Sequence, residues 1–341
     1  LLPESEFLLS LQYLIFFIPR YFYFLLTVYL CLLWKKLTVA KRYTLPVIVA
    51  LSFYMLDFQI NFDSLNINKN TKTSFTLITA NIGEGVELKK LESAIKFYNP
   101  DAFTFQESGH LAGTKAFKDY QFQDCKNNLC FISKYPFEKI NSLNNAMYKR
   151  YGDWAAFYEL KINNEKINLV NVHLPSVRSI FPRFNNISEI HSNRELAALI
   201  ISSWGASKNK VIISGDFNMS VSESIYRRTF NQFNNALSAQ GNGFNNTVNY
   251  TYRGLTLPGI RIDHILFSDD FNIEKATVLE SLGGDHYPVL STFSLKKADE
   301  CFLTNSMQGI QWVKTFKKAT FSNKRSNQIL KTLNKQITGK S

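Results

Sequence analysis

Polar side chains of the kinds that bind cations and phosphates follow several short apolar segments of this sequence. They are Asn81, Glu107, His173, Asp216 with Asn218, and Asp285 with His286. Carboxylate and amide oxygens are preferred ligands of a hard divalent cation such as Mg²⁺. Imidazoles can transfer protons or stabilise charge beside a phosphate. Gathered at one sheet edge, these groups would form a site that binds a divalent cation and hydrolyses a phosphate ester.

The sequence GDFN combines a carboxylate and an amide at a fixed spacing. Asp216 and Asn218 are two residues apart, so an extended backbone would project both to the same side. Gly215 permits a close backbone approach or an unusual dihedral angle. Such a pair can orient a water molecule and a phosphate oxygen. A turn that uses Asp, Asn and Gly for local reasons is the alternative interpretation.

Two Asp-His pairs occur near the C-terminal end of the same region. Asp263 and His264 lie in RIDHILF, where neighbouring residues of a strand would face opposite sides. Asp263 could then accept the Nδ1 proton of His286 and fix its tautomer. We expect His264 to serve as a packing or hydrogen-bonding residue. The alternative for GGDHYP is a glycine turn with a solvated pair, and a lone His173 would be a satisfied core histidine.

Glu107 ends a strand that is otherwise apolar, where a carboxylate is costly unless it is exposed or paired with a cation. Oxygen atoms of Asn81, Glu107 and Asp285 suit Mg²⁺, which keeps several waters and uses few protein ligands. Mn²⁺ would also fit this set.

Strands and helices alternate from residue 75 onward. Strands are predicted at Phe75–Ala80, Ala102–Gln106, Leu129–Ser133, Ala155–Ile162, Lys166–His173, Lys210–Ser214, Arg261–Phe267, Ala276–Leu279 and Pro288–Leu295. Helices are predicted at Leu88–Tyr98, Ile187–Trp204 and Glu223–Phe233, and an irregular loop at Asn234–Tyr250. Asn163-Asn164 is a plausible hairpin turn. Mixed hairpins and helix crossovers favour an α/β (α+β) fold with two packed sheets and helices outside.

The segments TANIG, FQES, NVHL, GDFN, RIDHILF and GGDHYPV together resemble the endonuclease/exonuclease/phosphatase superfamily. This group of Mg²⁺-dependent phosphodiesterases includes deoxyribonuclease I, exonuclease III, neutral sphingomyelinases and inositol polyphosphate 5-phosphatases. The resemblance covers roughly Phe75 to Leu295, and the motifs occur in the family's order. It implies a four-layer sandwich of two mixed sheets flanked by helices.

The resemblance also implies roles for the site residues. Glu107 would be the direct metal ligand, Asn81 would bind or support the metal, and Asp285 would complete the site. Asp216 would orient or deprotonate the attacking water, which Asn218 would hold together with the phosphate. His286, paired with Asp263, would contact the scissile phosphate, and His173 would stabilise the phosphate or assist the leaving group. The general acid and base among His173, Asp216 and His286 stay open. Further candidates for phosphate contacts are Arg150, Arg183 and Arg194, although a surface arginine is the simpler interpretation of each.

Residues 1–62 are more apolar than the rest and predict a membrane anchor. Phe7–Ile18 and Tyr21–Trp34 form one apolar stretch, and a second begins at Thr44. A bilayer requires ~20 apolar helical residues per span, so we predict an N-terminal transmembrane hairpin. A basic loop containing Lys35, Lys36, Lys41 and Arg42 favours the cytoplasmic side. The catalytic domain, after a linker at 63–74, would lie on the exported (periplasmic or extracellular) side. A buried helical hairpin in a soluble protein is the alternative.

The net charge of +12 is concentrated in the C-terminal extension, residues 296–341. Ten Lys or Arg and two acidic residues give this extension a charge of +8. It could contact anionic lipid or nucleic acid, or be a solvated extension. In the domain at 75–295, Cys125 and Cys130 could form a disulfide across a strand–turn–strand unit if that domain is exported.

Two functions of different classes are compatible with the sequence. The first is a membrane-tethered, Mg²⁺-dependent phosphodiesterase or phosphatase with a monomeric catalytic domain. Its substrate would be a phospholipid or sphingolipid head group, or DNA. The second is a catalytically silent membrane-bound binding or scaffold module with the same fold. Intact chemistry at every motif position favours the enzyme.

Overall fold

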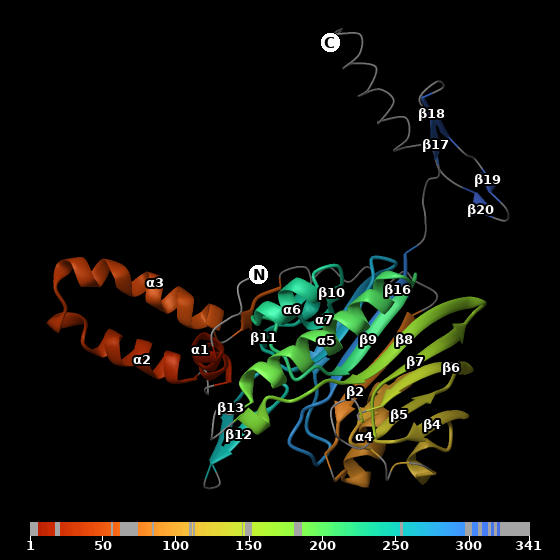
Figure 1. The fold of residues 1–341 in the computed structure, drawn as a ribbon, viewed down its shortest axis with the longest axis horizontal. Coiled ribbons are helices and arrows are strands. Elements are labelled where there is room, and N and C mark those ends of the chain that lie inside the picture. The colour runs from red at the N-terminus through yellow and green to blue at the C-terminus, as the bar shows by residue number, and fades with distance from the viewer. Residues whose placement is uncertain are drawn as a thin grey trace. The chain divides into compact units, whose positions relative to one another are not determined.

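Two six-stranded sheets lie at the centre of the computed structural model of the chain (Figure 1). The structure describes residues 6–17, 21–55, 57–61, 74–83, 85–108, 111, 113–144, 146, 152–180, 186–252, 255–296, 302–305, 309–312, 315–316 and 319–320. The chain divides into two compact units, Leu1–Ser294 and Leu295–Ser341. The sheets belong to the first unit.

The first sheet has the strand order β10-β14-β9-β8-β7-β6. Its strands are β6 (Phe137–Asn144), β7 (Asp153–Ile162), β8 (Glu165–His173), β9 (Val211–Asp216), β10 (Asn234–Asn235) and β14 (Asp263–Phe267). β8 and β9 are parallel and are connected through α5 (Ile187–Ala206), while the other pairs are antiparallel. The predicted turn between β7 and β8 is confirmed, since Asn163 and Asn164 both adopt positive φ, 48° and 67°.

The second sheet has the order β15-β16-β2-β3-β5-β4. Its strands are β2 (Ser74–Asn81), β3 (Ala102–Gln106), β4 (Phe122–Lys126), β5 (Leu129–Ser133), β15 (Phe271–Val278) and β16 (Val289–Leu295). α4 (Leu88–Tyr98) connects the parallel strands β2 and β3. This crossover places the C-terminal ends of both strands at the same edge of the sheet.

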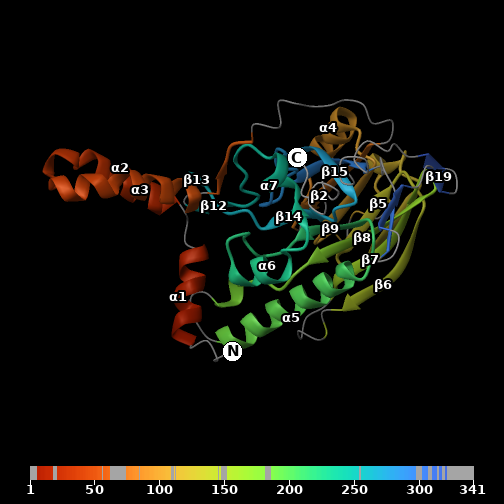
Figure 2. The same ribbon diagram turned by 90° about the horizontal axis from the view of Figure 1, so that it is seen from above.

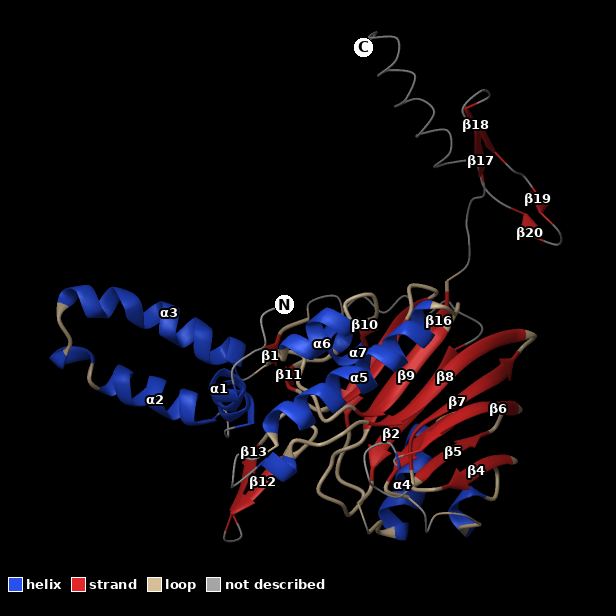
Figure 3. Cartoon of the chain, viewed as in Figure 1, coloured by secondary structure: helices blue, strands red, loops and turns tan. Residues whose placement is uncertain are grey.

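The sheets pack face to face, with helices on their outer faces (Figure 3). α5 and α6 (Ser224–Thr229) bury apolar side chains against the first sheet, and Leu91 of α4 packs against the second. A hydrogen bond of 2.9 Å between the hydroxyls of Thr104 and Ser214 joins the two sheets. The predicted architecture of two packed mixed sheets flanked by helices is therefore confirmed.

The N-terminal region forms α1 (Glu6–Phe17), α2 (Tyr21–Leu32), α3 (Val39–Met55) and β1 (Phe58–Gln59). No described helix is both long and apolar enough to cross a membrane, so the predicted transmembrane hairpin is not supported. The apolar stretch is divided into two 12-residue helices, each about 18 Å long at 1.5 Å per residue. α1 contacts α5 (Figure 2). β1 pairs with β11 (Gly243–Phe244).

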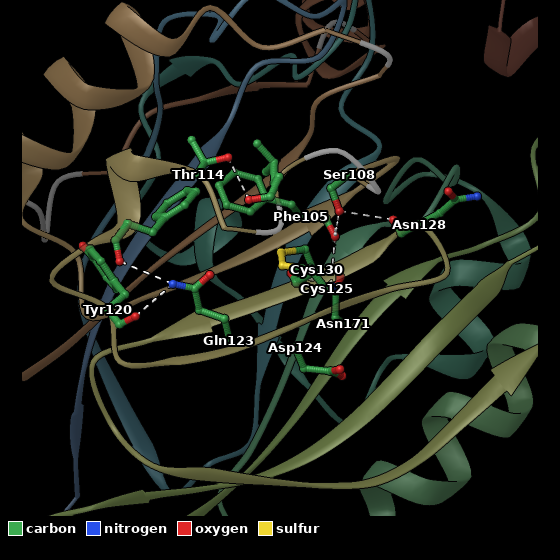
Figure 4. The surroundings of a disulfide bond; sticks show 12 residues. Phe105, Ser108, Thr114, Tyr120, Gln123, Asp124, Cys125, Asn128, Cys130 and Asn171 are labelled. Atoms are coloured by element: carbon green, nitrogen blue, oxygen red, sulfur yellow. Dashed lines mark hydrogen bonds between the residues drawn. A yellow bond between two sulfur atoms is a disulfide. The ribbon is translucent and has the colours of Figure 1, made fainter.

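Cys125 and Cys130 face each other across the β4–β5 hairpin and are joined by a disulfide (Figure 4). The turn of this hairpin supports the segment that follows β3. Asn128 O accepts hydrogen bonds from the backbone N–H of Ser108, 3.2 Å, and from its hydroxyl, 3.3 Å. The hairpin therefore holds the residue directly after Glu107.

Smaller elements connect these parts. They are η1 (Trp34–Lys36), η3 (Lys115–Phe117), η5 (Arg178–Ile180), α7 (Ala236–Gln240), β12 (Asn249–Tyr252) and β13 (Leu255–Pro258). In the second unit, β17 (Phe302–Asn305) pairs with β18 (Gly309–Trp312), and β19 (Thr315–Phe316) with β20 (Ala319–Thr320). The predicted helix Glu223–Phe233 is shorter than expected, because α6 ends at Thr229. The predicted loop 234–250 contains β10, α7 and β11, which pack on the domain.

Candidate active site

The strand registers bring the predicted site residues to one edge of the sandwich. Asn81 is aligned with Gln106, so Glu107 follows immediately beside it. In the other sheet, Asp216 is aligned with both His173 and Asp263. The parallel pairs β2–β3 and β8–β9 end at this edge, which explains why polar residues at strand ends converge.

Asp216 occupies the centre of this cluster and is 1% exposed. Its Oδ2 lies 3.1 Å from Asn81 Nδ2, which donates to it, and 3.7 and 3.9 Å from Nε2 of His173 and His286. Its Oδ1 accepts the backbone N–H of Asn218 at 2.7 Å. The two imidazole nitrogens are beyond direct hydrogen-bond distance, and such contacts in ligand-free sites often tighten when substrate binds.

Asn81 links Glu107 to the rest of the cluster. Its Nδ2 also donates to Glu107 Oε1 at 3.0 Å, while its Oδ1 accepts the N–H of Gly83 at 3.0 Å. Asn81 therefore orients two carboxylates with its amide protons, and in this arrangement its oxygen is engaged by the backbone. Glu107 has φ of 53°, a sparsely populated conformation for a non-glycine residue that is often found at functional sites.

His286 and Asp263 form the predicted hydrogen bond, with Nδ1 donating to Asp263 Oδ2 at 2.8 Å. Burial on its own would lower the pKa of His286, but the carboxylates of Asp263, Asp216 and Asp285 outweigh it and raise the pKa to about 10. The imidazole is therefore a cation at neutral pH. Thr247 holds this pair in place, because its Oγ1 accepts the N–H of Asp263 at 3.1 Å and its carbonyl accepts the N–H of Tyr287 at 2.7 Å.

The GDFN segment is fixed by its backbone. Gly215 has φ of 141°, and a Cβ there would lie 2.0 Å from the carbonyl oxygen of Val172, so only glycine fits beside β8. Asn218 has φ of 49°, and its Nδ2 donates to the carbonyl of Leu174 at 3.0 Å. Asp216 and Asn218 are thereby brought to the same edge as predicted.

Two groups of residues could hold a divalent cation. Asp216, Asp263 and His286 offer ligand atoms within 4.8 Å of one another, but the mutual hydrogen bonds of His286 and Asp263 already occupy part of this set. In the predicted set of Asn81, Glu107 and Asp285, each carboxylate has one hydrogen-bond donor and stays accessible to water, with the side chain of Glu107 39% and that of Asp285 55% exposed. Carboxylates that retain access to water fit Mg²⁺, which keeps part of its hydration shell.

Arg178 is the site residue that the sequence interpretation missed. Its Nη2 donates to Asp285 Oδ2 at 3.1 Å, and it lies on η5, five residues after His173. The only indication in the sequence was that Arg178 follows the motif residue His173 closely. Three arginines were proposed as phosphate contacts. The prediction is wrong for Arg194, because its side chain is fully buried and its guanidinium is hydrogen-bonded to Glu223. Arg150 and Arg183 lie outside the described residues.

The other two histidines that the structure describes, His191 and His264, are bonded outside the cluster. Burial, with a smaller effect of Arg261, lowers the pKa of His264 to about 3, so the ring is neutral. Its Nε2 donates to Met219 O at 2.8 Å, and its Nδ1 accepts from Asn235 Nδ2 at 3.1 Å. The expectation of a hydrogen-bonding role for His264 is confirmed.

Two packed mixed sheets flanked by helices, with carboxylates, amides and imidazoles at one edge, define an α/β sandwich whose site could bind a metal and a phosphate. The sequence profile of the endonuclease/exonuclease/phosphatase family matches residues 64–286. The chain belongs to this family, whose members are hydrolases that act on phosphoesters and generally use divalent metal ions. No curated protein matches the chain in sequence.

Solved structures share the fold at low sequence identity. A family member from Bacteroides thetaiotaomicron has a TM-score of 0.50 at 15% identity and covers 66% of this chain and 99% of its own. One from Beutenbergia cavernae has a TM-score of 0.50 at 12% identity, with coverage of 68% and 75%. TDP2 from Caenorhabditis elegans has a TM-score of 0.50 at 18% identity, with coverage of 72% and 79%.

Proposed function

We propose that the chain is a Mg²⁺-dependent hydrolase of phosphate esters, acting as a phosphodiesterase or a phosphatase. One observation carries this proposal: Asn81, Glu107, His173, Asp216 and the Asp263–His286 pair come from separate strands and loops and meet at one sheet edge. A scaffold would not require Glu107 in a strained conformation or a buried imidazolium beside two carboxylates.

Each side chain has a role that follows from its surroundings. Glu107, oriented by Asn81, and Asp285 would hold Mg²⁺, which when bound supplies positive charge to the phosphate oxygens. The His286 cation, kept charged by Asp263, would donate to a phosphate oxygen and stabilise charge in the transition state. Asp216, held by the N–H of Asn218, would accept a proton from the attacking water or orient it. His173, 3.7 Å from Asp216, would stabilise the phosphate or protonate the leaving group.

The test uses the full chain with bis(p-nitrophenyl) phosphate and p-nitrophenyl phosphate as substrates. We expect turnover that EDTA abolishes and Mg²⁺ restores. Glu107→Gln should lower kcat/KM about 10²–10³-fold, the usual cost of removing one charge-stabilising group. The matched control is Glu138→Gln, an exposed carboxylate of β6, which should leave kcat/KM unchanged. If neither ester is hydrolysed in an EDTA-sensitive reaction, the alternative of a catalytically silent scaffold module is favoured.

We further propose that the enzyme works at a membrane, on the exported side, with a lipid head group as the favoured substrate. Large apolar side chains stay exposed on α2 and α3, including Leu25 at 54%, Leu26 at 55% and Leu32 at 79%. Exposed apolar surface of this extent is typical of a membrane or protein contact. Lys35, Lys36 and Arg42 lie at the connection between the two helices, where they suit anionic lipid. The Cys125–Cys130 disulfide supports an oxidising compartment.

Nucleic acid is the other substrate class that this site chemistry accommodates. Plasmid DNA and phospholipid vesicles, offered separately to the full chain with Mg²⁺, would distinguish the two. Nicking of DNA without release of a lipid head group would contradict the lipid proposal and leave the hydrolase proposal intact.

A further inference from the structure

A buried arginine links the N-terminal helix to the GDFN segment. Arg194, on α5, is 0% exposed. Its Nη2 donates to the backbone carbonyl of Asn218 at 2.5 Å, and its Nη1 donates to Glu223 Oε2 and to Tyr13 Oη, both at 2.9 Å. One guanidinium therefore contacts α1, the start of α6 and the backbone of a proposed catalytic residue.

The same network fixes the residues on both sides of Asn218. Glu223 uses its second oxygen, Oε1, to accept the N–H of Ser220 at 2.7 Å. His264 donates to the carbonyl of Met219 at 2.8 Å. Asn218, Met219 and Ser220 are thus each held by a buried side chain. Arg194 and Glu223 are joined by one hydrogen bond, and each binds the backbone of this loop, Arg194 at the carbonyl of Asn218 and Glu223 at the N–H of Ser220.

Tyr13 orients the arginine from the other side. Because a guanidinium can only donate, the Tyr13 oxygen accepts from Arg194, and the same hydroxyl is hydrogen-bonded to His191 Nδ1, 2.9 Å away. The guanidinium also lies over the Tyr13 ring, 5.2 Å from its centroid. Tyr13 is 1% exposed and packs with Val177 and Ile180, in the segment that follows His173. α1 therefore contacts the segment that follows His173 directly, and the segment that follows Asp216 through Arg194.

Stability alone is a poor explanation for this arrangement. Removing a guanidinium and a carboxylate from water costs several kcal/mol, which their attraction seldom repays beyond what apolar residues would provide. Arg194 Nε also lacks a hydrogen-bond partner among the described residues. A buried charge retained under these conditions is better explained by the geometry that it imposes on the Asn218 carbonyl.

We propose that Tyr13 and Arg194 are positioning residues for Asn218, so that α1, which lies outside the residues 64–286 matched by the family, completes the active site of this chain. The proposal rests on the proposed hydrolase function of Asn218. Without Tyr13, Arg194 gains freedom to move, the Asn218 carbonyl loses its fixed partner, and the catalytic loop samples other conformations.

The test compares Tyr13→Phe, which removes a single oxygen, with Tyr120→Phe. Tyr120 is a matched control, because it is also buried and donates to a backbone carbonyl, that of Pro100 at 2.7 Å, in the core of the second sheet. We expect Tyr13→Phe to lower kcat about five-fold, the worth of one net hydrogen bond, with KM nearly unchanged. Tyr120→Phe should leave kcat unchanged. Arg194→Lys, which keeps the charge but cannot reach three partners, should lower kcat further.

A double-mutant cycle separates positioning from general destabilisation. In an Asn218→Ala background, Tyr13→Phe should have no further effect on kcat if it acts through Asn218. Equal effects in both backgrounds, or unchanged kcat in Tyr13→Phe, would overturn the proposal while leaving the hydrolase function standing.

Hydrogen exchange provides a readout that does not need turnover. Amides in the 217–223 segment should exchange faster in Tyr13→Phe than in wild type, and those of the β4–β5 hairpin should not. If the wild-type chain hydrolysed no phosphoester, the proposed function would fail. The exchange rates of these amides would then still show whether Tyr13 and Arg194 hold the Asn218 segment in place. Equal exchange rates of the 217–223 amides in Tyr13→Phe and wild type would refute this positioning role.

Discussion

The ionisation of His264 bears directly on folding. It is fully buried in β14, and burial lowers its pKa to about 3. In the unfolded chain the pKa of histidine is about 6.5. Because the folded-state pKa is the lower of the two, the unfolded state binds the proton first as pH falls. The stability contributed by the neutral ring is therefore complete above about pH 6.5 and is lost progressively toward pH 3.

We expect His264→Gln to reduce the acid sensitivity of the fold. At pH 5 the wild-type histidine should have lost about 2 kcal/mol of unfolding free energy relative to pH 7, since 1.5 pH units at about 1.36 kcal/mol each separate pH 5 from the unfolded pKa. The glutamine variant, whatever its stability at pH 7, should lack this part of the decrease. Urea unfolding at pH 7 and pH 5 measures both differences. Equal decreases in the two proteins would show that His264 does not titrate as inferred.

At the level of secondary structure, the β4–β5 hairpin matters because it supports the turn after Glu107. Its disulfide closes a short loop, because Cys130 is five positions after Cys125. In the chain-entropy description such a loop stabilises the fold by about 2 kcal/mol. Asn128, in the turn, accepts two hydrogen bonds from Ser108 (Figure 4). Loss of the disulfide should therefore loosen the segment that carries the proposed metal ligand.

The corresponding prediction concerns the double variant Cys125→Ser, Cys130→Ser. Its free energy of unfolding should be about 2 kcal/mol lower than that of wild type, measured by urea denaturation without reductant. Cys31→Ser is the control, because Cys31 is a free, exposed cysteine of α2, and it should leave stability unchanged. A double variant as stable as wild type would mean that the hairpin is held without its disulfide.

The comparison of sequence with structure shows which elements local information determines. Polar residues that follow apolar segments were predicted to gather at one sheet edge. In the structure the parallel pairs β2–β3 and β8–β9 bring Asn81, Glu107, His173 and Asp216 there. The opposite roles of Asp263 and His264 followed from alternation along a strand. Such inferences need only the local backbone.

Arg194 shows what local information could not determine. Its position on α5 is compatible with a solvent-facing or phosphate-binding arginine, and its burial depends on long-range contacts with Tyr13, Glu223 and the Asn218 carbonyl. That contact joins residues 181 positions apart, and apolar α1 offered no sequence signal to distinguish packing on the domain from insertion into a bilayer. Glu223 was likewise assigned to a helix without any indication that it would pair with Arg194.

At the level of the whole first unit, the N-terminal region has two attachments to the catalytic sandwich. α1 is attached through Tyr13, and β1 pairs with β11, next to an ion pair of 2.9 Å between Arg261 and Asp57. Between these attachments, α2 and α3 pair with each other and expose most of their large apolar side chains. The exposure of these side chains is why we propose a lipid contact for this surface.

Flotation of the full chain with vesicles tests that assignment. Wild type should bind vesicles containing anionic lipid more tightly than neutral ones, because each Lys or Arg near an anionic surface contributes about 1 kcal/mol. Leu25→Glu with Leu26→Glu should reduce binding at least about ten-fold, since burying one leucine is worth about 1.5–3 kcal/mol. Phe97→Glu, on α4 and 80% exposed, should bind like wild type. An equal loss of vesicle binding in the leucine double variant and in Phe97→Glu would show that α2 is not the specific contact. If wild type did not float with vesicles, the proposed lipid contact would be refuted.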